Sequence, residues 1–372
     1  MRIIYSFNKT GYEAQFWQRE IVASSTPSHE FIPFNHGEYL NPGRYIRAQL
    51  LDNLYYEKDP GLLKLYDSFS ALLVATGAGA VVVDNCHPYH PEYLRTLSIS
   101  KVLRTSDGPL SAYDRDFAYL HAYDLVLYHS PAYSRDMGMA EKLAYCGAKE
   151  SRFWPLALFD TMYQAKKNED EVFAQKRDIE VLFVGALFPN KMALLASVKK
   201  TFGARCHLHG LAGWKKNLYF NLKYGFPGWV LPIRFEEYVP LYQRTKIGIN
   251  THNRGKYTVG GFRLFELPGN GVMQISDGGE YLGEFFKVGE EIESYDTTEE
   301  LIDKIKFYLA HDSARERIAR AGYRRVLRDH RIGHRLETAA DFIHAIDPKR
   351  TIDFAHVSSC SNKTGEAIND DI

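Results

Sequence analysis

Short apolar runs, rich in Val, Ile and Leu, recur along this chain, and longer segments of helical character separate them. Apolar strands that alternate with helices predict parallel sheets built from β-α-β units. We expect strands at 2–7 (RIIYSF), 71–75 (ALLVA), 80–84 (AVVVD), 101–106 (KVLRTS), 124–130 (DLVLYHS), 180–186 (EVLFVGA), 205–210 (RCHLHG), 246–250 (KIGIN) and 272–276 (VMQIS). The fold class predicted from this pattern is α/β.

The length of 372 residues predicts two domains. The boundary is expected at 153–160 (FWPLALFD), because a proline follows an aromatic pair there and a polar, helix-like stretch comes next. The first domain would then cover 1–155 and the second 156–333. The tail 351–372 is rich in Ser, Asn and Asp without periodicity, and we expect it to be disordered.

Charge and cysteine content exclude several classes of protein. The 46 Lys and Arg residues balance the 46 Asp and Glu residues, so no global field would attract nucleic acid. The four cysteines are scattered, which predicts neither a disulfide framework nor a zinc site. The chain starts as a strand and a turn, and no apolar run approaches the length of a membrane span. We expect a cytoplasmic protein, with peripheral contact at the inner membrane face left open.

The segment 257–309 combines a Gly-rich turn, a helix start and a buried strand. Gly260 and Gly261 allow the backbone to approach a ligand closely, and the helix that follows would offer free N–H groups to an anion. Arg263 and Glu266 are three residues apart and share a helix face. Arg263 can bind phosphate oxygens, while Glu266 can accept from a sugar hydroxyl. The alternative is an exposed ion pair within the helix.

Three stretches carry a family resemblance: GGFRLFELPGNGV (260–272), EEIESYDTTEELIDKIKFYL (290–309) and ARERIARAGYRRVLRDH (314–330). They resemble the C-terminal half of GT-B-type group 1 glycosyltransferases, in the branch related to spore-maturation (CgeB-like) glycosyltransferases. The resemblance is strong over about 245–335 and weaker over 1–245. It implies two Rossmann-like domains whose parallel sheets face each other across a cleft, with a final helix at 334–350 that crosses back to the first domain.

The resemblance implies a donor site on the second domain. The family's turn G-R-L-x-x-x-K corresponds to 185–191, where Gly185 and Lys191 match and Ala186 replaces the arginine. Arg263 could supply the missing cation. The alternative for Lys191 is an ordinary solvated lysine in the first turn of a helix.

Glu266 aligns with the second glutamate of the family's E-x7-E motif, which holds the donor ribose, whereas Thr258 stands at the position of the first. The backbone amides of Gly260 and Gly261 would face the donor sugar or the β-phosphate, or these residues are simply loop glycines. Asn250 ends a predicted strand, and His252 with Arg254 in the loop after it would line the pocket.

Arg234 and Phe235 would flank the nucleotide base. They lie near the end of the aromatic and locally basic segment 213–238. One interpretation of this segment is docking at a membrane that carries a lipid-linked acceptor. The other is a packed insertion near the base, because the spacing is not cleanly amphipathic and Pro227 and Pro232 interrupt it.

In the first domain, Asp107 replaces the histidine of the T-x-H-G motif that many group 1 enzymes have here. An aspartate in a cleft could act as general base, or stabilise positive charge at the anomeric carbon, or simply cap a turn. The stereochemical outcome stays open. Lys9, Gly11 and Glu13 lie in the turn after the first strand and are expected on the acceptor side.

The pairs His87/His90 and His207/His209 lack a carboxylate or cysteine to complete a metal site, so we expect no metal. We expect no other cofactor. The predicted function is transfer of a sugar from a nucleoside diphosphate sugar to a hydroxyl of a glycan, lipid-linked or protein acceptor. The alternatives are a nucleotide-sugar epimerase, or a non-catalytic sugar- or nucleotide-binding or surface-assembly protein, which the departures at Thr258 and Ala186 favour.

Overall fold

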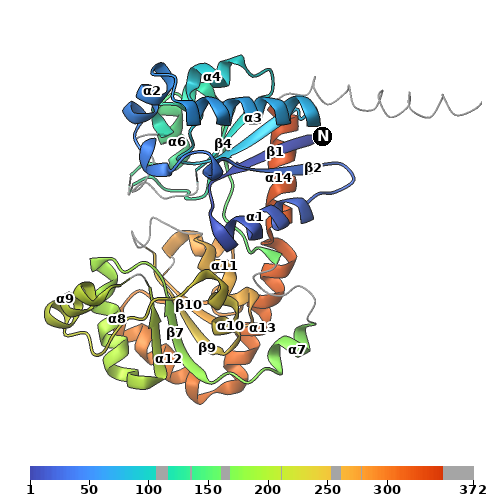
Figure 1. Cartoon of the computed structure of the whole chain (residues 1–372). Helices are drawn as coiled ribbons and strands as arrows, with labels where there is room; N and C mark the ends of the chain where they lie inside the picture. The colour runs from blue at the N-terminus through green and yellow to red at the C-terminus, as the bar shows by residue number, and fades with distance from the viewer. Residues whose placement is uncertain are drawn as a thin grey trace, which may run out of the picture. The chain divides into compact units, whose positions relative to one another are not determined.

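The computed structural model describes residues 1–105, 116–134, 136–160, 168–210, 212–252, 261–277 and 279–346. The chain divides into two compact units, each built on one parallel sheet (Figure 1). The first unit comprises 1–128, 140–154 and, among the described residues, 336–346. The second comprises 129–139 and 155–335.

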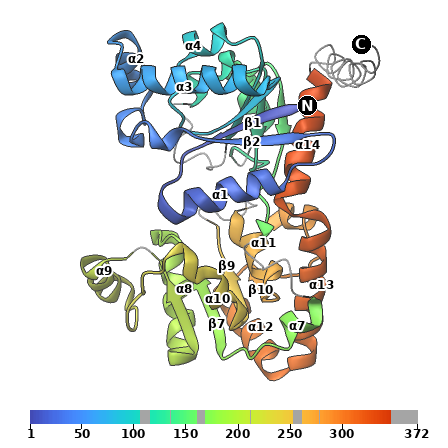
Figure 2. The same cartoon turned by 45° about the vertical axis from the view of Figure 1, so that its right-hand side comes forward.

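The first unit carries a six-stranded sheet in the order β2-β1-β3-β4-β5-β6, with every pair parallel. Its strands are β1 (Arg2–Phe7), β2 (Glu30–Asn35), β3 (Ala80–Asp84), β4 (Ser100–Thr105), β5 (Leu125–Tyr128) and β6 (Ser151–Phe153). Its main helices are α1 (Gly11–Ala23), α2 (Ala48–Tyr56), α3 (Pro60–Thr76), α4 (Pro91–Thr96) and α6 (Met139–Tyr145). Helices α1 and α3 lie on opposite faces of the sheet (Figures 1 and 2).

The prediction of a strand at 71–75 is wrong, because these residues form the last turns of α3. Asp59 caps this helix through its side chain and Pro60 occupies the first turn, which fixes the helix start. Its buried residues Leu62, Leu65 and Phe69 recur at helical spacing, and Gly77 ends the helix in the left-handed conformation. The apolar run ALLVA is therefore a helix end.

The second unit carries a five-stranded parallel sheet in the order β11-β10-β9-β7-β8. Its strands are β7 (Ile179–Val184), β8 (Cys206–His209), β9 (Thr245–Asn250), β10 (Met273–Ser276) and β11 (Glu293–Ser294). Its helices are α7 (Glu169–Phe173), α8 (Pro189–Phe202), α9 (Trp214–Tyr224), α10 (Tyr238–Gln243), α11 (Phe262–Gly269), α12 (Thr298–Ala310) and α13 (Asp312–Asp329). Helix α14 (Ile332–Ile346) begins in this unit and ends in the first.

The core of the second unit lies between the sheet and helices α8 and α12. Ile247 and Ile275 of the central strands pack there with Leu195 of α8 and Leu301 of α12. The opposite sheet face is covered by α11 and α13 (Figure 2). Helix α12 has a capped start, because Thr297 accepts a hydrogen bond from the backbone N–H of Glu300 at 3.1 Å.

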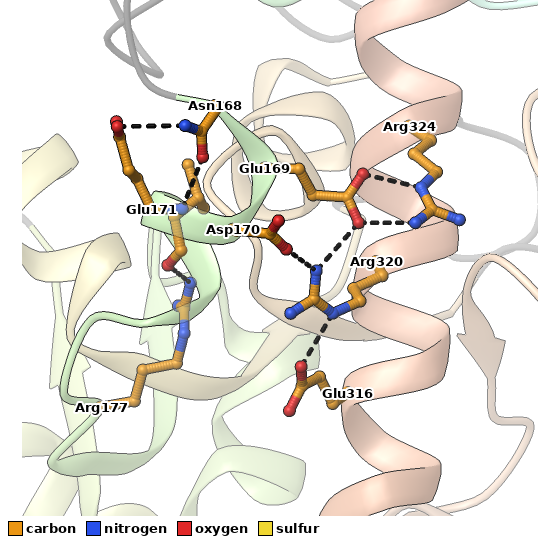
Figure 3. Close-up of polar contacts among 9 residues, drawn as sticks. Asn168, Glu169, Asp170, Glu171, Arg177, Glu316, Arg320 and Arg324 are labelled. Carbon is orange, nitrogen blue, oxygen red and sulfur yellow. Dashed lines mark hydrogen bonds and ion pairs between the residues drawn. The ribbon is translucent and has the colours of Figure 1, made fainter.

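Charged side chains tie α7 to α13 just after the predicted domain boundary (Figure 3). The carboxylate of Glu169 accepts hydrogen bonds from Arg324 at 2.7 Å and from Arg320 at 3.0 Å. These two guanidinium groups hold the pKa of Glu169 below its ordinary value. The Arg320 guanidinium also lies 4.3 Å from the ring centroid of Phe173. The network thus attaches α7 to α13 within the second unit.

Gln274 in the middle of β10 is fully buried, and in the part of the chain that the structure describes neither atom of its amide has a hydrogen-bond partner. It pairs with Gly248, which contacts Leu267 of α11, so it lies on the face covered by that helix. Replacing Gln274 by Met should raise the free energy of unfolding by about 1–3 kcal/mol, because an unsatisfied buried amide is removed at similar volume. Urea unfolding would measure it.

The matched control is Gln49→Met on the exposed surface of α2, which should leave stability within about 0.5 kcal/mol of the parent. A loss of stability in Gln274→Met would contradict this account and show that the amide has a partner.

Candidate functional site

The carboxyl ends of the central strands of the second sheet meet at one edge. Strands β7, β9 and β10 are parallel neighbours, and the residues that follow them are Gly185, Thr251 and Asp277. Helices α8 and α11 begin at the same edge, and neither has a side-chain cap on its first turn. Ligands of doubly wound folds bind at such strand ends, and uncapped helix starts favour anions.

Two cations converge at this edge. Lys191 lies in the first turn of α8 and is only 5% exposed, and Arg263 lies in the first turn of α11. Burial and the charge of Arg263 lower the pKa of Lys191 to about 8. A Cβ atom at Gly185 would lie 3.6 Å from Cζ of Arg263 and 2.9 Å from the Phe183 ring, so glycine permits this close packing.

Neither cation has a carboxylate partner among the residues that the structure describes. The Nε atom of Arg263 is buried without a hydrogen-bond partner there. The ammonium group of Lys191 lies 5.9 Å from the ring centroids of Phe183 and Phe188, and forms no ion pair with any described residue. Two adjacent, partly buried cations are unfavourable alone and are stabilised by a bound anion.

The nearby negative charge of Asp277 is already engaged. Its carboxylate accepts from the backbone N–H of His252 at 2.9 Å, lies 2.8 Å from Nδ1 of the same histidine, and accepts from Thr251 at 3.1 Å. Asn250, predicted to bind the donor, is buried and donates to Ser276 at 3.0 Å. These bonds lock the ends of β9 and β10 together and hold the edge in shape.

Glu266 lies one turn after Arg263 on α11 and is only 7% exposed. The hydroxyl of Tyr242, from α10, donates to its carboxylate at 3.0 Å. Burial raises the pKa of Glu266, and the charge of Arg263 and the bond from Tyr242 offset this only in part. Arg263 and Glu266 form no ion pair, so the alternative of an exposed intrahelical pair is wrong. The carboxylate of Glu266 thus already accepts from one hydroxyl group, that of Tyr242.

Of the other residues predicted to bind the donor, the structure describes Gly261 and Arg234, and the rest lie outside the described part of the chain. Gly261 is the residue before α11, and apart from its two chain neighbours no atom of the described residues would lie within 4 Å of a Cβ atom at this position. Arg234 is exposed, and its backbone N–H donates to Glu237 at 2.7 Å in the first turn of the 3-10 helix η6 (Phe235–Glu237). The predicted residues that lie outside the described part of the chain are Asp107, Arg254, Thr258 and Gly260.

The three residues predicted on the acceptor side lie after β1 in the first unit. Gly11 begins α1 with a φ of +56°, a conformation that favours glycine. Lys9 and Glu13 form an ion pair with each other at 2.7 Å, and the Lys9 ammonium lies 5.3 Å from the Trp17 ring centroid. Glu13 is thereby neutralised locally.

Sequence reasoning missed two residues of the site, Tyr242 and Asp277. Asp277 directly follows a predicted strand, so its position at a strand end could have revealed it. Tyr242 has no such signal, because only tertiary packing brings it to Glu266. Over the described ranges, no group of three His, Cys, Asp or Glu residues could hold a metal ion. Within the same ranges, no helix is long and apolar enough to cross a membrane.

Comparison with known proteins places this geometry in context. Residues 191–341 match the model of a family described as glycosyl transferase-like, and this match includes Lys191, Arg263 and Glu266. A search of curated proteins by sequence found no match.

Solved structures are similar over nearly the whole chain. Sucrose-phosphate synthase from Thermosynechococcus elongatus has a TM-score of 0.57 at 13% identity and covers 94% of this chain and 100% of its own. Anabaena HepE in complex with UDP has a TM-score of 0.58 at 12% identity, covering 93% and 100%. A glycosyltransferase from Rickettsia africae has a TM-score of 0.56 at 11% identity, covering 93% and 98%. The prediction of two GT-B-type, Rossmann-like parallel-sheet domains is confirmed; the CgeB-like branch stays a prediction.

Proposed function

We propose that this chain is a glycosyltransferase that takes a sugar from a nucleoside diphosphate sugar held on the second unit. The observation that carries the proposal is the pair Lys191 and Arg263, which lie at the carboxyl edge of the sheet without a carboxylate partner among the described residues. The match of 191–341 to a glycosyl transferase-like family supports it. So does the complex of the structurally similar HepE with UDP-glucose.

The proposed chemistry follows from where charge develops. When the glycosidic bond breaks, negative charge grows on the leaving diphosphate. In the proposed complex, Lys191, Arg263 and the starts of α8 and α11 would surround this position and stabilise the charge without reorganising. Glu266 would accept hydrogen bonds from the ribose hydroxyls. The acceptor, a hydroxyl of a glycan, lipid-linked or protein substrate, would be activated by a base such as Asp107.

Binding of the diphosphate should weaken as the pH rises above about 8, because Lys191 then loses its proton in the free protein. Affinity should fall up to about tenfold per pH unit in that range. In Arg263→Gln the fall should begin at higher pH, since removing the neighbouring charge raises the pKa of Lys191. Calorimetric titration between pH 7 and 9 would measure the profile. Equal pH profiles for the parent and Lys191→Gln would contradict the assignment.

The proposed reaction is tested by release of nucleoside diphosphate from a panel of nucleotide sugars, with and without sugar acceptors. We expect release with one donor, reduced about 100-fold or more in Lys191→Gln and unchanged in the exposed variant Lys64→Gln. Because side chains supply the positive charge, addition of EDTA should leave the rate unchanged. Tight diphosphate binding without release from any donor would favour the non-catalytic alternative.

A further inference from the structure

The second unit contains a long stretch of one charge. Residues 181–235 include six lysines, two arginines and no aspartate or glutamate, although the whole chain has a net charge of zero. Helix α9 lies within this stretch. It packs against α8 at the rim of the unit, beyond the edge strand β8 (Figures 1 and 2). Every Lys, Arg, Asp or Glu residue within 181–235 is therefore basic.

Helix α9 has two apolar faces rather than one. Asn217 and Phe220 are buried against the unit. Trp214, Leu218 and Leu222 recur every four residues on a different face and are exposed to solvent, Trp214 at 62% and Leu222 at 79%. The prediction that 213–238 is a packed insertion thus explains only the face of α9 that carries Asn217 and Phe220.

The loop that follows α9 adds to the exposed apolar face. Trp229 and Leu231 are both exposed. The loop is fixed against the helix, because Asn217 exchanges hydrogen bonds with the backbone of Val230 at 2.8 and 3.2 Å, and Asn221 donates to the carbonyl of Gly228 at 3.1 Å. We call the set of exposed apolar residues the α9 surface; it consists of Trp214, Leu218, Tyr219, Leu222, Trp229 and Leu231.

Lysines border the α9 surface. Lys215 and Lys223 are exposed, and their ammonium groups lie 5.6 Å from the ring centroid of Trp214 and 5.2 Å from that of Tyr219. Exposed Trp and Leu residues flanked by lysines are typical of helices that lie in the interface of an anionic bilayer. Because 181–235 lacks acidic residues, a second copy of the surface would repel the first. The aliphatic Leu218 and Leu222 offer nothing to a nucleic acid.

We propose that the α9 surface docks on an anionic lipid bilayer, with Trp214, Leu222 and Trp229 inserted at the level of the headgroups. This inference does not depend on the proposed glycosyl transfer, since it concerns binding to lipid alone. Insertion is driven by burial of the apolar side chains, and the surrounding lysines add attraction to anionic lipids that salt screens.

The protein carries its own fluorescent reporter for this contact. Of its four tryptophans, Trp17 and Trp154 are buried, so only Trp214 and Trp229 can change environment at a membrane. Vesicles of phosphatidylcholine with roughly a third of phosphatidylglycerol should shift the emission to shorter wavelength and sediment the protein. Vesicles of phosphatidylcholine alone should bind it at least tenfold more weakly, and 1 M salt should reverse most of the binding to anionic vesicles.

Matched variants separate the two contributions. Leu222→Glu should weaken vesicle binding at least tenfold, whereas Val74→Glu, an exposed apolar position on α3, should have no effect. The double variant Lys215→Glu/Lys223→Glu should weaken binding in the same way, with Lys64→Glu as control. The proposal is overturned by absence of any vesicle binding, by equal binding of Leu222→Glu and parent, or by equal affinity for neutral vesicles. Binding of RNA or self-association that replaces vesicle binding would also overturn it.

Discussion

Replacement of Lys191 by Met should weaken the binding of a nucleoside diphosphate and at the same time stabilise the fold. The loss should be roughly 10- to 100-fold, because a charge-assisted bond to phosphate contributes about 1.5–3 kcal/mol. The free energy of unfolding should rise because the charged form of Lys191 is unfavourable in the free protein. Lys191 is buried, lies beside Arg263 and has no carboxylate partner in the described ranges.

The sign of the stability change follows from the lowered pKa of Lys191. At pH 7 the lysine is protonated in the folded and the unfolded chain, so the whole electrostatic penalty is present there. This penalty declines as the pH rises above about 8, because the folded protein then releases the proton while the unfolded chain still keeps it. Removing the ammonium group at pH 7 should therefore raise the free energy of unfolding, by an amount on the order of 1–3 kcal/mol.

Calorimetric titration with nucleoside diphosphates and urea unfolding would measure the two effects on the same variant. Lys200→Met, at an exposed position of the same helix, is the control and should change neither quantity. A lysine that merely supports the fold would show the opposite pattern. A variant that is less stable than the parent and still binds the diphosphate would contradict the proposed role.

The second large effect concerns a buried ion pair in the first unit. Asp84 and Arg104, at the ends of β3 and β4, form a buried salt bridge, and the Tyr5 hydroxyl donates to the same carboxylate at 3.0 Å. Burial lowers the pKa of Arg104, but the charge of Asp84, its hydrogen bond and the contribution of Tyr5 together more than offset this, so the net pKa is raised. Asp84→Ala should destabilise the protein by about 3–5 kcal/mol, because it leaves a buried guanidinium unpaired.

An exposed pair provides the control for this prediction. Glu180 and Arg205 lie 3.2 Å apart at the surface of the second unit, and Glu180→Ala should cost less than about 1 kcal/mol. Replacing the whole buried set, with Asp84→Leu, Arg104→Met and Tyr5→Phe together, should recover most of the loss. A cost for Asp84→Ala no larger than that for Glu180→Ala, measured by urea unfolding, would contradict the assignment of a buried pair.

The sequence predicts the sheets because buried parallel strands are apolar throughout, and all but one of the expected strands are present. The run at 71–75 is misleading because composition alone does not distinguish a helix end from a strand; the cap at Asp59 decides it. Strand β2 escapes prediction because Pro33 interrupts its pattern, which an edge strand tolerates.

The site is predictable where its residues are close in sequence to a turn or helix start. This holds for Lys191, Arg263 and Glu266. The structure brings the two cations among them, Lys191 and Arg263, together. Tyr242 comes from a separate helix, and the close approach of Arg263 to Gly185 depends on tertiary packing. Such properties arise only in the folded unit. The roles predicted for Asp107 and Thr258 stay predictions.

The most direct test of nucleotide-sugar binding is the thermal shift of the protein against a panel of nucleoside diphosphates, with Glu266→Gln as the variant. A ligand at 100 times its Kd adds about 2.7 kcal/mol of stability, which gives a clear rise in melting temperature. We predict such a rise with one diphosphate, strongly reduced in Glu266→Gln, whose side chain keeps the volume but loses the charge. A well-folded protein that no diphosphate stabilises would contradict the proposed function.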